Sequence, residues 1–191
     1  MRKPRAAAIT VLALATLGAV LWIALSAGER EPVYEGKTLT YCLSDYWPGH
    51  NPTSSEKLNQ DIVAVRQIGT NAIPILLQWI SAKDGPLKQK MVTWIDRHPR
   101  MPFRIESSVD KNMLAASGFN ILGKSQAGSA VPALVEIVRS GGGEKTSCNN
   151  VTFALCALAD LDREAAAKAG VKFGTNGIVI GWSAPSAAAN Q

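Results

Sequence analysis

Apolar residues recur at intervals of three and four positions through most of the chain beyond residue 53. Such spacing places side chains on one face of an α-helix. The segments that show it are residues 56–68, 72–80, 87–96, 108–122, 130–138, 150–161 and, more weakly, 163–169. Strand-like alternation is not sustained anywhere before Ile178. The pattern therefore predicts an all-α domain.

Each of these segments has one apolar face, which we expect to point into a shared core. The residues expected to be buried are Leu58, Ile62, Val65, Ile68, Ile73, Leu76, Leu77, Ile80, Leu87, Met91, Trp94, Ile95, Met113, Leu114, Ser117, Gly118, Ile121, Leu134, Val135, Val138, Val151, Leu155, Leu158 and Leu161.

Helix starts are marked by short polar residues. Residues 53–56 (Thr-Ser-Ser-Glu) have the form of a capping box with Thr53 as N-cap, and Ser107 precedes an acidic first turn. Asn71 is expected to cap the helix that contains Pro74. Because Gly69 separates two such segments by a short turn, residues 56–80 are predicted to form an antiparallel helix hairpin.

The first 27 residues differ from the rest of the chain. Residues 6–27 contain no charged side chain and would extend about 33 Å as a helix, enough to cross a hydrocarbon core of about 30 Å. Arg2, Lys3 and Arg5 precede them, which favours a cytoplasmic N-terminus and export of the remainder. We expect a single-pass membrane anchor, with a signal peptide cleaved near Ser26 as the alternative.

This pattern divides the chain into four parts. They are a signal anchor (1–27), a tether with a short helix (28–52), a helical domain (53–170) and a C-terminal tail (171–191) expected to be disordered beyond Pro185. In a two-membrane bacterium the exported domain would be periplasmic.

Charge adds little to this picture. The chain carries a net charge of +5, but residues 28–191 hold 17 basic and 15 acidic side chains, so much of the excess precedes the apolar run. Lys83, Lys88 and Lys90 lie near Trp94, yet acidic neighbours such as Asp84 dilute that patch. The composition therefore argues against a nucleic-acid partner.

Candidate catalytic and cofactor-binding residues are few. Residues 140–146 resemble a phosphate loop, but Glu144 stands where glycine is required. His50 and His98 lack neighbours at metal-ligand spacing. Residues 160–164 contain three carboxylates at a helix junction, which we interpret as a solvated cluster. We therefore expect no catalytic residue, no cofactor and no metal.

Two smaller features leave alternatives open. Cys148 and Cys156 can form a disulfide in an oxidising compartment, or they can act with Cys42 as small hydrophobic side chains, which we favour. Asn150 begins a glycosylation sequon that matters only in a eukaryotic secretory route.

An internal repeat gives the strongest clue to the fold. Residues 67–77 and 120–135 both read as a helix end, glycine, a short turn, Ala-aliphatic-Pro and an apolar helix. A degenerate third unit follows Asn150 without the proline. The arrangement resembles HEAT repeats, and with the entry segment 34–39 it resembles membrane-anchored bacterial HEAT-repeat proteins. The resemblance implies a short α-solenoid of antiparallel helix hairpins across residues 53–170.

That resemblance also orders the possible functions. HEAT-like surfaces hold peptides or proteins, so we expect a membrane-anchored, non-enzymatic scaffold with a protein or peptide partner. The alternatives are a lyase-like enzyme accessory that acts on a cofactor or modified protein, and a purely structural envelope protein.

Overall fold

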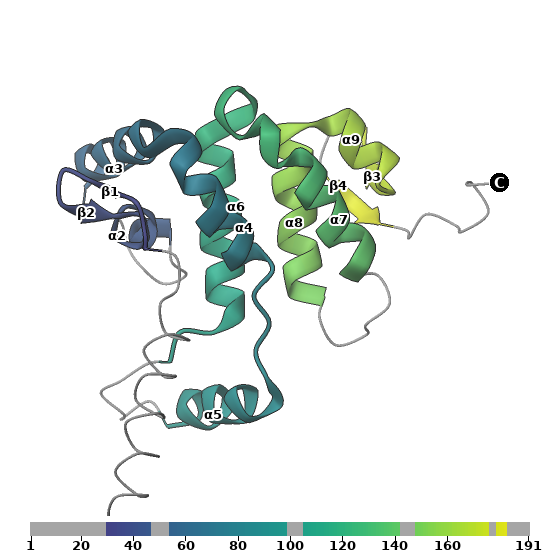
Figure 1. The fold of residues 1–191 in the computed structure, drawn as a ribbon. Helices are drawn as coiled ribbons and strands as arrows, with labels where there is room; N and C mark the ends of the chain where they lie inside the picture. Colours follow the sequence, from purple (N-terminus) through teal and green to yellow (C-terminus); the bar gives the residue numbers. More distant parts are fainter. Residues whose placement is uncertain (1–29, 47–53, 99–104, 142–147, 176–178, 183–191) are drawn as a thin grey trace, which may run out of the picture. The chain divides into compact units, whose positions relative to one another are not determined.

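The computed structural model describes residues 30–46, 54–98, 105–141, 148–175 and 179–182, and the structural statements below concern these residues. A compact unit that begins at Glu31 contains all the described elements. The elements are mostly helices, which confirms the predicted all-α character (Figure 1).

The helices follow the predicted segments closely. They are α2 (Leu39–Leu43), α3 (Ser55–Ile68), α4 (Ile73–Ile80), α5 (Pro86–Asp96), α6 (Ser108–Ala127), α7 (Val131–Gly141), α8 (Cys148–Leu161) and α9 (Arg163–Lys168). Short 3₁₀ turns lie at Ser44–Tyr46 (η1), Gly69–Ala72 (η2) and Gly128–Ala130 (η3).

Four helices form the main packed layer. α6 lies between α4 and α8, and α7 packs on the other side of α8 (Figure 1). α3 runs across this layer and packs on α6 and α2, and it meets α4 mainly at η2. The expected antiparallel hairpin of α3 and α4 is therefore not observed, since each helix finds its principal partner elsewhere.

The two repeated segments share a local geometry. Gly69 and Gly123 both have positive φ, at 59° and 66°, a region in which glycine has no steric penalty. Gly69 begins η2 directly, whereas Gly123 lies inside α6, and four further residues of that helix precede η3. Both 3₁₀ turns lead into a helix whose second residue is proline, Pro74 or Pro132. The motif read from the sequence therefore corresponds to two related turns of different length.

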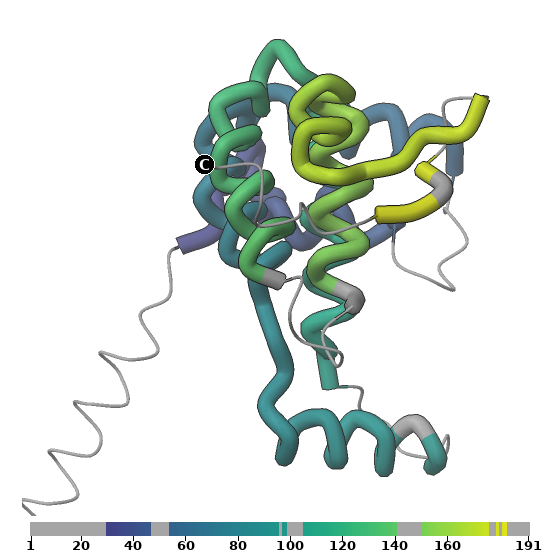
Figure 2. The backbone as a smooth tube through the Cα atoms, turned by 90° about the vertical axis from the view of Figure 1, so that its right-hand side faces the viewer, coloured from purple at the N-terminus to yellow at the C-terminus, as the bar shows by residue number. Residues whose placement is uncertain are grey.

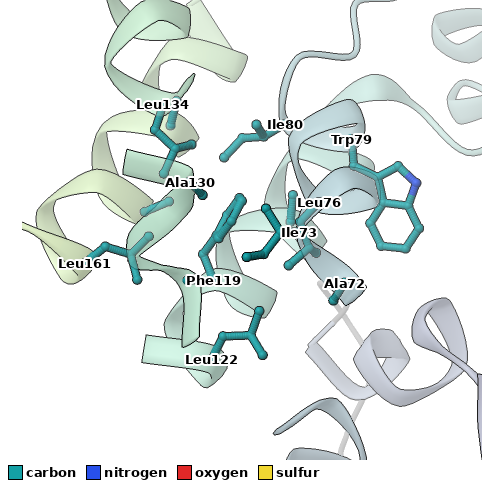
Figure 3. Close-up of a cluster of buried hydrophobic side chains, with 14 of the residues drawn as sticks. Ala72, Ile73, Leu76, Trp79, Ile80, Phe119, Leu122, Ala130, Leu134 and Leu161 are labelled. Carbon is teal, nitrogen blue, oxygen red and sulfur yellow. The ribbon is translucent and has the colours of Figure 1, made fainter. Parts of the chain in front are cut away.

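Phe119 of α6 lies at the centre of the core. It is fully buried, and Figure 3 shows it between side chains of α4, such as Leu76, and those of Leu134 and Leu161. Burying an aromatic side chain of this size contributes roughly 1.5–3 kcal/mol, so this contact helps to join the two ends of the helix layer.

The helical domain was predicted to begin at residue 53, but the compact unit begins earlier in the chain, at Glu31. Leu39, Cys42 and Leu43 of α2 are completely buried in the same core, so this helix is part of the domain and not of a tether. A hairpin of β1 (Val33–Tyr34) and β2 (Lys37–Thr38) precedes it.

The predicted C-terminal tail also contains ordered structure. β3 (Val171–Phe173) and β4 (Val179–Trp182) form an antiparallel pair. Val171 is buried, and the Trp182 Nε1–H donates to the Ala169 carbonyl at 3.0 Å. These strands were missed because each is too short to show sustained alternation. The tail predicted beyond Pro185 lies outside the described residues.

The predicted helix caps were correct at one site and wrong at two. Ser107 and Asp110 form the capping box at the start of α6. At α3 the N-cap is Ser54, which accepts from the Lys57 N–H, one residue later than the expected N-cap Thr53, which lies outside the described residues. Asn71 lies within η2 and does not cap α4.

Candidate functional site

Helix α5 exposes the apolar face that the sequence pattern placed in the core. Leu87, Met91 and Trp94 are 73%, 46% and 51% exposed, whereas Ile95 is buried. We name Leu87, Met91 and Trp94 the α5 stripe. Figures 1 and 2 both show α5 apart from the helix layer. The prediction that these three side chains point inward is therefore wrong.

Polar contacts hold the start of α5. The Asp84 carboxylate accepts from the Lys88 Nζ at 2.7 Å and from the Ser108 backbone N–H at 2.8 Å. Desolvation acts to raise the pKa of Asp84, but these hydrogen bonds outweigh it, and the pKa is lowered. This carboxylate therefore links the first turn of α5 to the first turn of α6.

The other end of α5 carries an aromatic pair. The ring centroids of Trp94 and His98 lie 4.6 Å apart, and the His98 Nδ1 is 2.7 Å from the Trp94 carbonyl oxygen. His98 is exposed, in keeping with the surface-loop role expected for it. His50 lies outside the described residues.

A second surface feature is a groove of about 420 Å³ between the β1–β2 hairpin and α3. The hairpin contributes Tyr34, Glu35 and Lys37, and α3 contributes Glu56, Asn59, Gln60, Val63 and Ala64. We name this feature the α3 groove. Val63 is 52% exposed on it. The sequence pattern gave no indication of this groove, because it depends on how a hairpin meets a helix.

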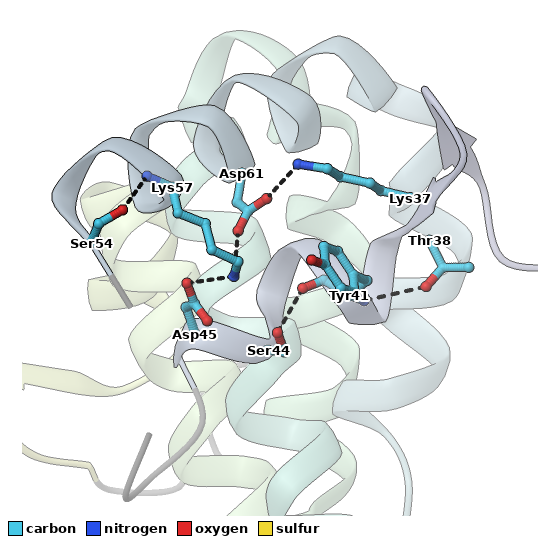
Figure 4. Close-up of polar contacts among 8 residues, drawn as sticks. All are labelled: Lys37, Thr38, Tyr41, Ser44, Asp45, Ser54, Lys57 and Asp61. Atoms are coloured by element: carbon cyan, nitrogen blue, oxygen red, sulfur yellow. Dashed lines mark hydrogen bonds and ion pairs between the residues drawn. The ribbon is translucent and has the colours of Figure 1, made fainter. Parts of the chain in front are cut away.

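A charged cluster fixes the two sides of the α3 groove relative to each other (Figure 4). Asp61 of α3 is completely buried and accepts from the Lys37 Nζ at 3.3 Å and from the Lys57 Nζ at 3.1 Å. Lys57 also donates to Asp45 at 2.7 Å, a contact that raises the pKa of Lys57. Both ammonium groups lie over the Tyr41 ring.

This cluster is a structural tie between β2, α2 and α3. Both oxygens of Asp61 have a partner and the four charges balance, which is what a buried carboxylate requires. Cys42 is buried beside it, and desolvation raises the pKa of its thiol, which disfavours the reactive thiolate. The cluster therefore positions the groove without itself supplying reactive groups.

The acidic residues at the α8–α9 junction also have structural partners. Asp162 is the N-cap of α9, and a hydrogen bond from the Ala165 N–H lowers its pKa. Asp160 accepts from Asn120 at 2.9 Å, and Glu164 pairs with Lys168. These contacts agree with the predicted solvated cluster at a helix junction.

The remaining candidates can be placed in part. Cys156 is exposed in α8 and has a free thiol, whereas the side chain of Cys148 lies outside the described part of the structure. Asn150 is only 4% exposed, so its sequon is inaccessible in the folded chain. Most of residues 140–146 lies outside the described residues.

Within the described part of the chain, no three His, Cys, Asp or Glu residues gather in a way that could hold a metal ion. None of the described helices has the length and apolar character needed to cross a membrane, and the predicted anchor at residues 6–27 lies outside them. No family model, curated protein or solved structure matches the chain.

Proposed function

We propose that the chain is a membrane-anchored helical scaffold that binds an extended segment of a protein partner in the α3 groove. The observation that carries this proposal is the groove itself, a concave surface between two elements that a buried charge cluster holds together. Apolar surface that remains exposed beside polar groups is typical of interaction sites.

The groove chemistry suits a peptide. The amides of Asn59 and Gln60 are exposed and carry both donors and acceptors, as a peptide backbone does. Val63 and Tyr34 offer apolar contact, and the carboxylates of Glu35 and Glu56 favour a segment that also carries a basic side chain. The positive charge of Lys37 is already directed towards Asp61.

The finer architecture belongs to the same proposal. The two glycine–3₁₀–proline segments support a HEAT-like α-solenoid, with α8 and α9 as a degenerate last unit. Its first unit departs from the HEAT pattern, because α3 and α4 do not pack as an antiparallel hairpin. Residues 6–27 would anchor it with the N-terminus in the cytoplasm and the helical domain exported, on the strength of their charge-free sequence.

Photo-crosslinking tests the groove. A photoreactive amino acid replaces Gln60 in the full chain in its native membrane, and the control carries it at Gln89 on α5, which is also exposed. We expect a protein adduct from position 60 that the control lacks and that Val63→Glu abolishes with no change in melting temperature. The proposal is contradicted if positions 60 and 89 give the same adduct, or if the adduct from position 60 persists in Val63→Glu.

Alkaline carbonate extraction tests the anchor separately. A chain held by residues 6–27 stays with the membrane after extraction, and its mature N-terminus lies before residue 6. Release into the soluble fraction with a new N-terminus near Ala27 would show that the segment is a cleaved signal peptide.

A further inference from the structure

We propose that α5 is a membrane-surface helix that lays the α5 stripe on an anionic lipid bilayer. An interfacial helix has one apolar face, basic residues along its border and aromatic residues at the level of the headgroups. The described residues of α5 meet each of these conditions, and the proposed occupant is lipid at a site separate from the α3 groove.

The apolar face of α5 is continuous and uncovered. Leu87, Met91 and Trp94 stand at positions i, i+4 and i+7, so their side chains form one row along the helix. All three are exposed, although α5 belongs to the same compact unit as the buried helices. A leucine, a methionine and a tryptophan in one exposed row present a larger apolar surface than a solvated helix needs.

Basic side chains border that row. Lys90 and Arg97 follow Leu87 by three and ten positions, which places both beside the stripe on the same flank. Both are exposed. Long basic side chains in this position can extend their charged groups to lipid phosphates while their methylene groups stay in contact with the apolar layer.

The charge of the exported part is concentrated here. Residues 83–98 contain four basic and two acidic side chains, whereas the remainder of residues 28–191 contains 13 of each. Lys88, which borders the stripe on its other flank, pairs with Asp84. The net positive charge near the stripe complements an anionic lipid surface. It would repel a basic peptide of the kind expected in the α3 groove, so lipid is the better occupant.

The short connection between the proposed anchor and the compact unit keeps α5 within reach of the bilayer. On this point the inference rests on the anchor proposed above. Only residues 28–30 separate the apolar run from the compact unit, and fully extended they allow about 14 Å between Ala27 and Glu31. A domain on so short a connection stays at the bilayer surface, where a weakly binding amphipathic helix meets lipid at high effective concentration.

Quenching by brominated lipids tests this contact in the full chain. The protein is reconstituted in vesicles of equal parts phosphatidylglycerol and phosphatidylcholine, with or without bromine on the acyl chains. The emission of Trp94 is obtained as the difference between the wild type and Trp94→Phe, which removes the signals of the other tryptophans. Both leaflets have the same composition, so either orientation of the chain reports the contact.

We expect bromine to quench the Trp94 emission at least about three times more strongly in these vesicles than in pure phosphatidylcholine. The emission of Trp182, obtained through Trp182→Phe, should be insensitive to bromine. Lys90→Glu with Arg97→Glu should abolish most of the Trp94 quenching, whereas Arg139→Glu with Lys172→Glu, which changes the net charge equally, should preserve it.

Several outcomes overturn the proposal. If bromine does not quench the Trp94 emission in either vesicle type, the α5 stripe does not contact lipid. A protein partner or a second copy of the chain would then be its occupant. If quenching is equal in neutral and anionic vesicles, or if both double variants lose it equally, Lys90 and Arg97 do not direct the stripe to anionic lipid. Carbonate extraction reports the anchor independently, so a failed contact at α5 and a failed anchor give different results.

Discussion

Helices α4 and α5 follow each other in the chain and look alike in sequence, yet only α4 is buried. Both have proline near the start, at Pro74 and Pro86, and apolar residues at helical spacing. In α4, Leu76 and Ile80 are completely buried, while in α5 Leu87 and Trp94 are more than half exposed. Periodicity therefore identifies an apolar face but not what covers it.

The difference comes from what lies opposite each helix. Gly118 of α6 faces α4 so closely that an added Cβ would lie 2.6 Å from a Leu76 methyl carbon. Asn112 of α6 donates to the carbonyls of Trp79, Ile80 and Ala82 and so satisfies the end of α4. α5 has neither kind of contact among the described residues and is held at its start by Asp84.

The largest expected effect is in the buried helix. Leu76→Ala should lower the free energy of unfolding by about 2–5 kcal/mol, because it leaves a cavity in the packed layer. Leu134→Ala, at a fully buried position of α7, should have an effect of similar size. Chemical denaturation followed by circular dichroism measures both. A loss below about 1 kcal/mol for Leu76→Ala would mean that α4 and α5 differ less than the structure implies.

The next effect concerns the polar end of α4. Asn112→Ala should destabilise the fold by about 1–3 kcal/mol, because it leaves buried carbonyl groups without a donor. Asn120→Ala, also on α6 but exposed and bonded to Asp160, is the matched control and should change stability by less than about 0.5 kcal/mol. Equal effects for the two asparagines would contradict a special role for Asn112.

Gly118→Ala tests the close approach of α6 to α4. The new methyl group would displace the buried Leu76 side chain, so we expect a loss of about 1–3 kcal/mol. Combined with Leu76→Ala, the new methyl group occupies part of the cavity, and the double variant should be less destabilised than the two single losses added together. Simple additivity in a double-mutant cycle would show that the two positions do not compete for space.

A smaller effect concerns the polar tie that holds α5. The folded-state pKa of Asp84 is lowered, so its stabilising contribution is present above its unfolded value of about 3.9 and is lost as pH falls through the folded pKa. Asp84→Asn should therefore flatten the stability profile on the acid side. Unfolding midpoints measured across the acid range provide the check, and identical profiles for the wild type and Asp84→Asn would argue against the tie.

The smallest effect is expected on the surface of α5. Leu87→Ala and His98→Ala should each change the free energy of unfolding by less than about 0.5 kcal/mol, because both side chains are exposed at the surface. Leu87→Ala should nevertheless weaken the quenching of Trp94 by brominated lipid. A large loss of stability in Leu87→Ala without lipid would show that the stripe is covered within the folded chain.

Two buried polar residues left a signal that sequence analysis could have used. Asp61 shares a helix face with Leu58, Ile62 and Val65, and Asn112 shares one with Ala115 and Phe119. A polar residue on an apolar face must have a partner in the core. Asp61 has one partner nearby in sequence, Lys57 at four residues, but its other partner, Lys37, lies 24 residues away. The end of α4 lies more than 30 residues from Asn112, so the signal marks the residue but not its long-range contact.

The sequence by itself determined the helices, because their spacing, caps and glycine–proline turns act within a few residues. It predicted α3, α4, α6, α7 and α8 closely, and it anticipated the shared geometry after Gly69 and Gly123. The tertiary structure alone decided which apolar faces became core, where the hairpin met α3 to form a groove, and that α5 remained uncovered. Burial depends on what the rest of the chain brings opposite a residue, and the spacing within one helix does not contain that information.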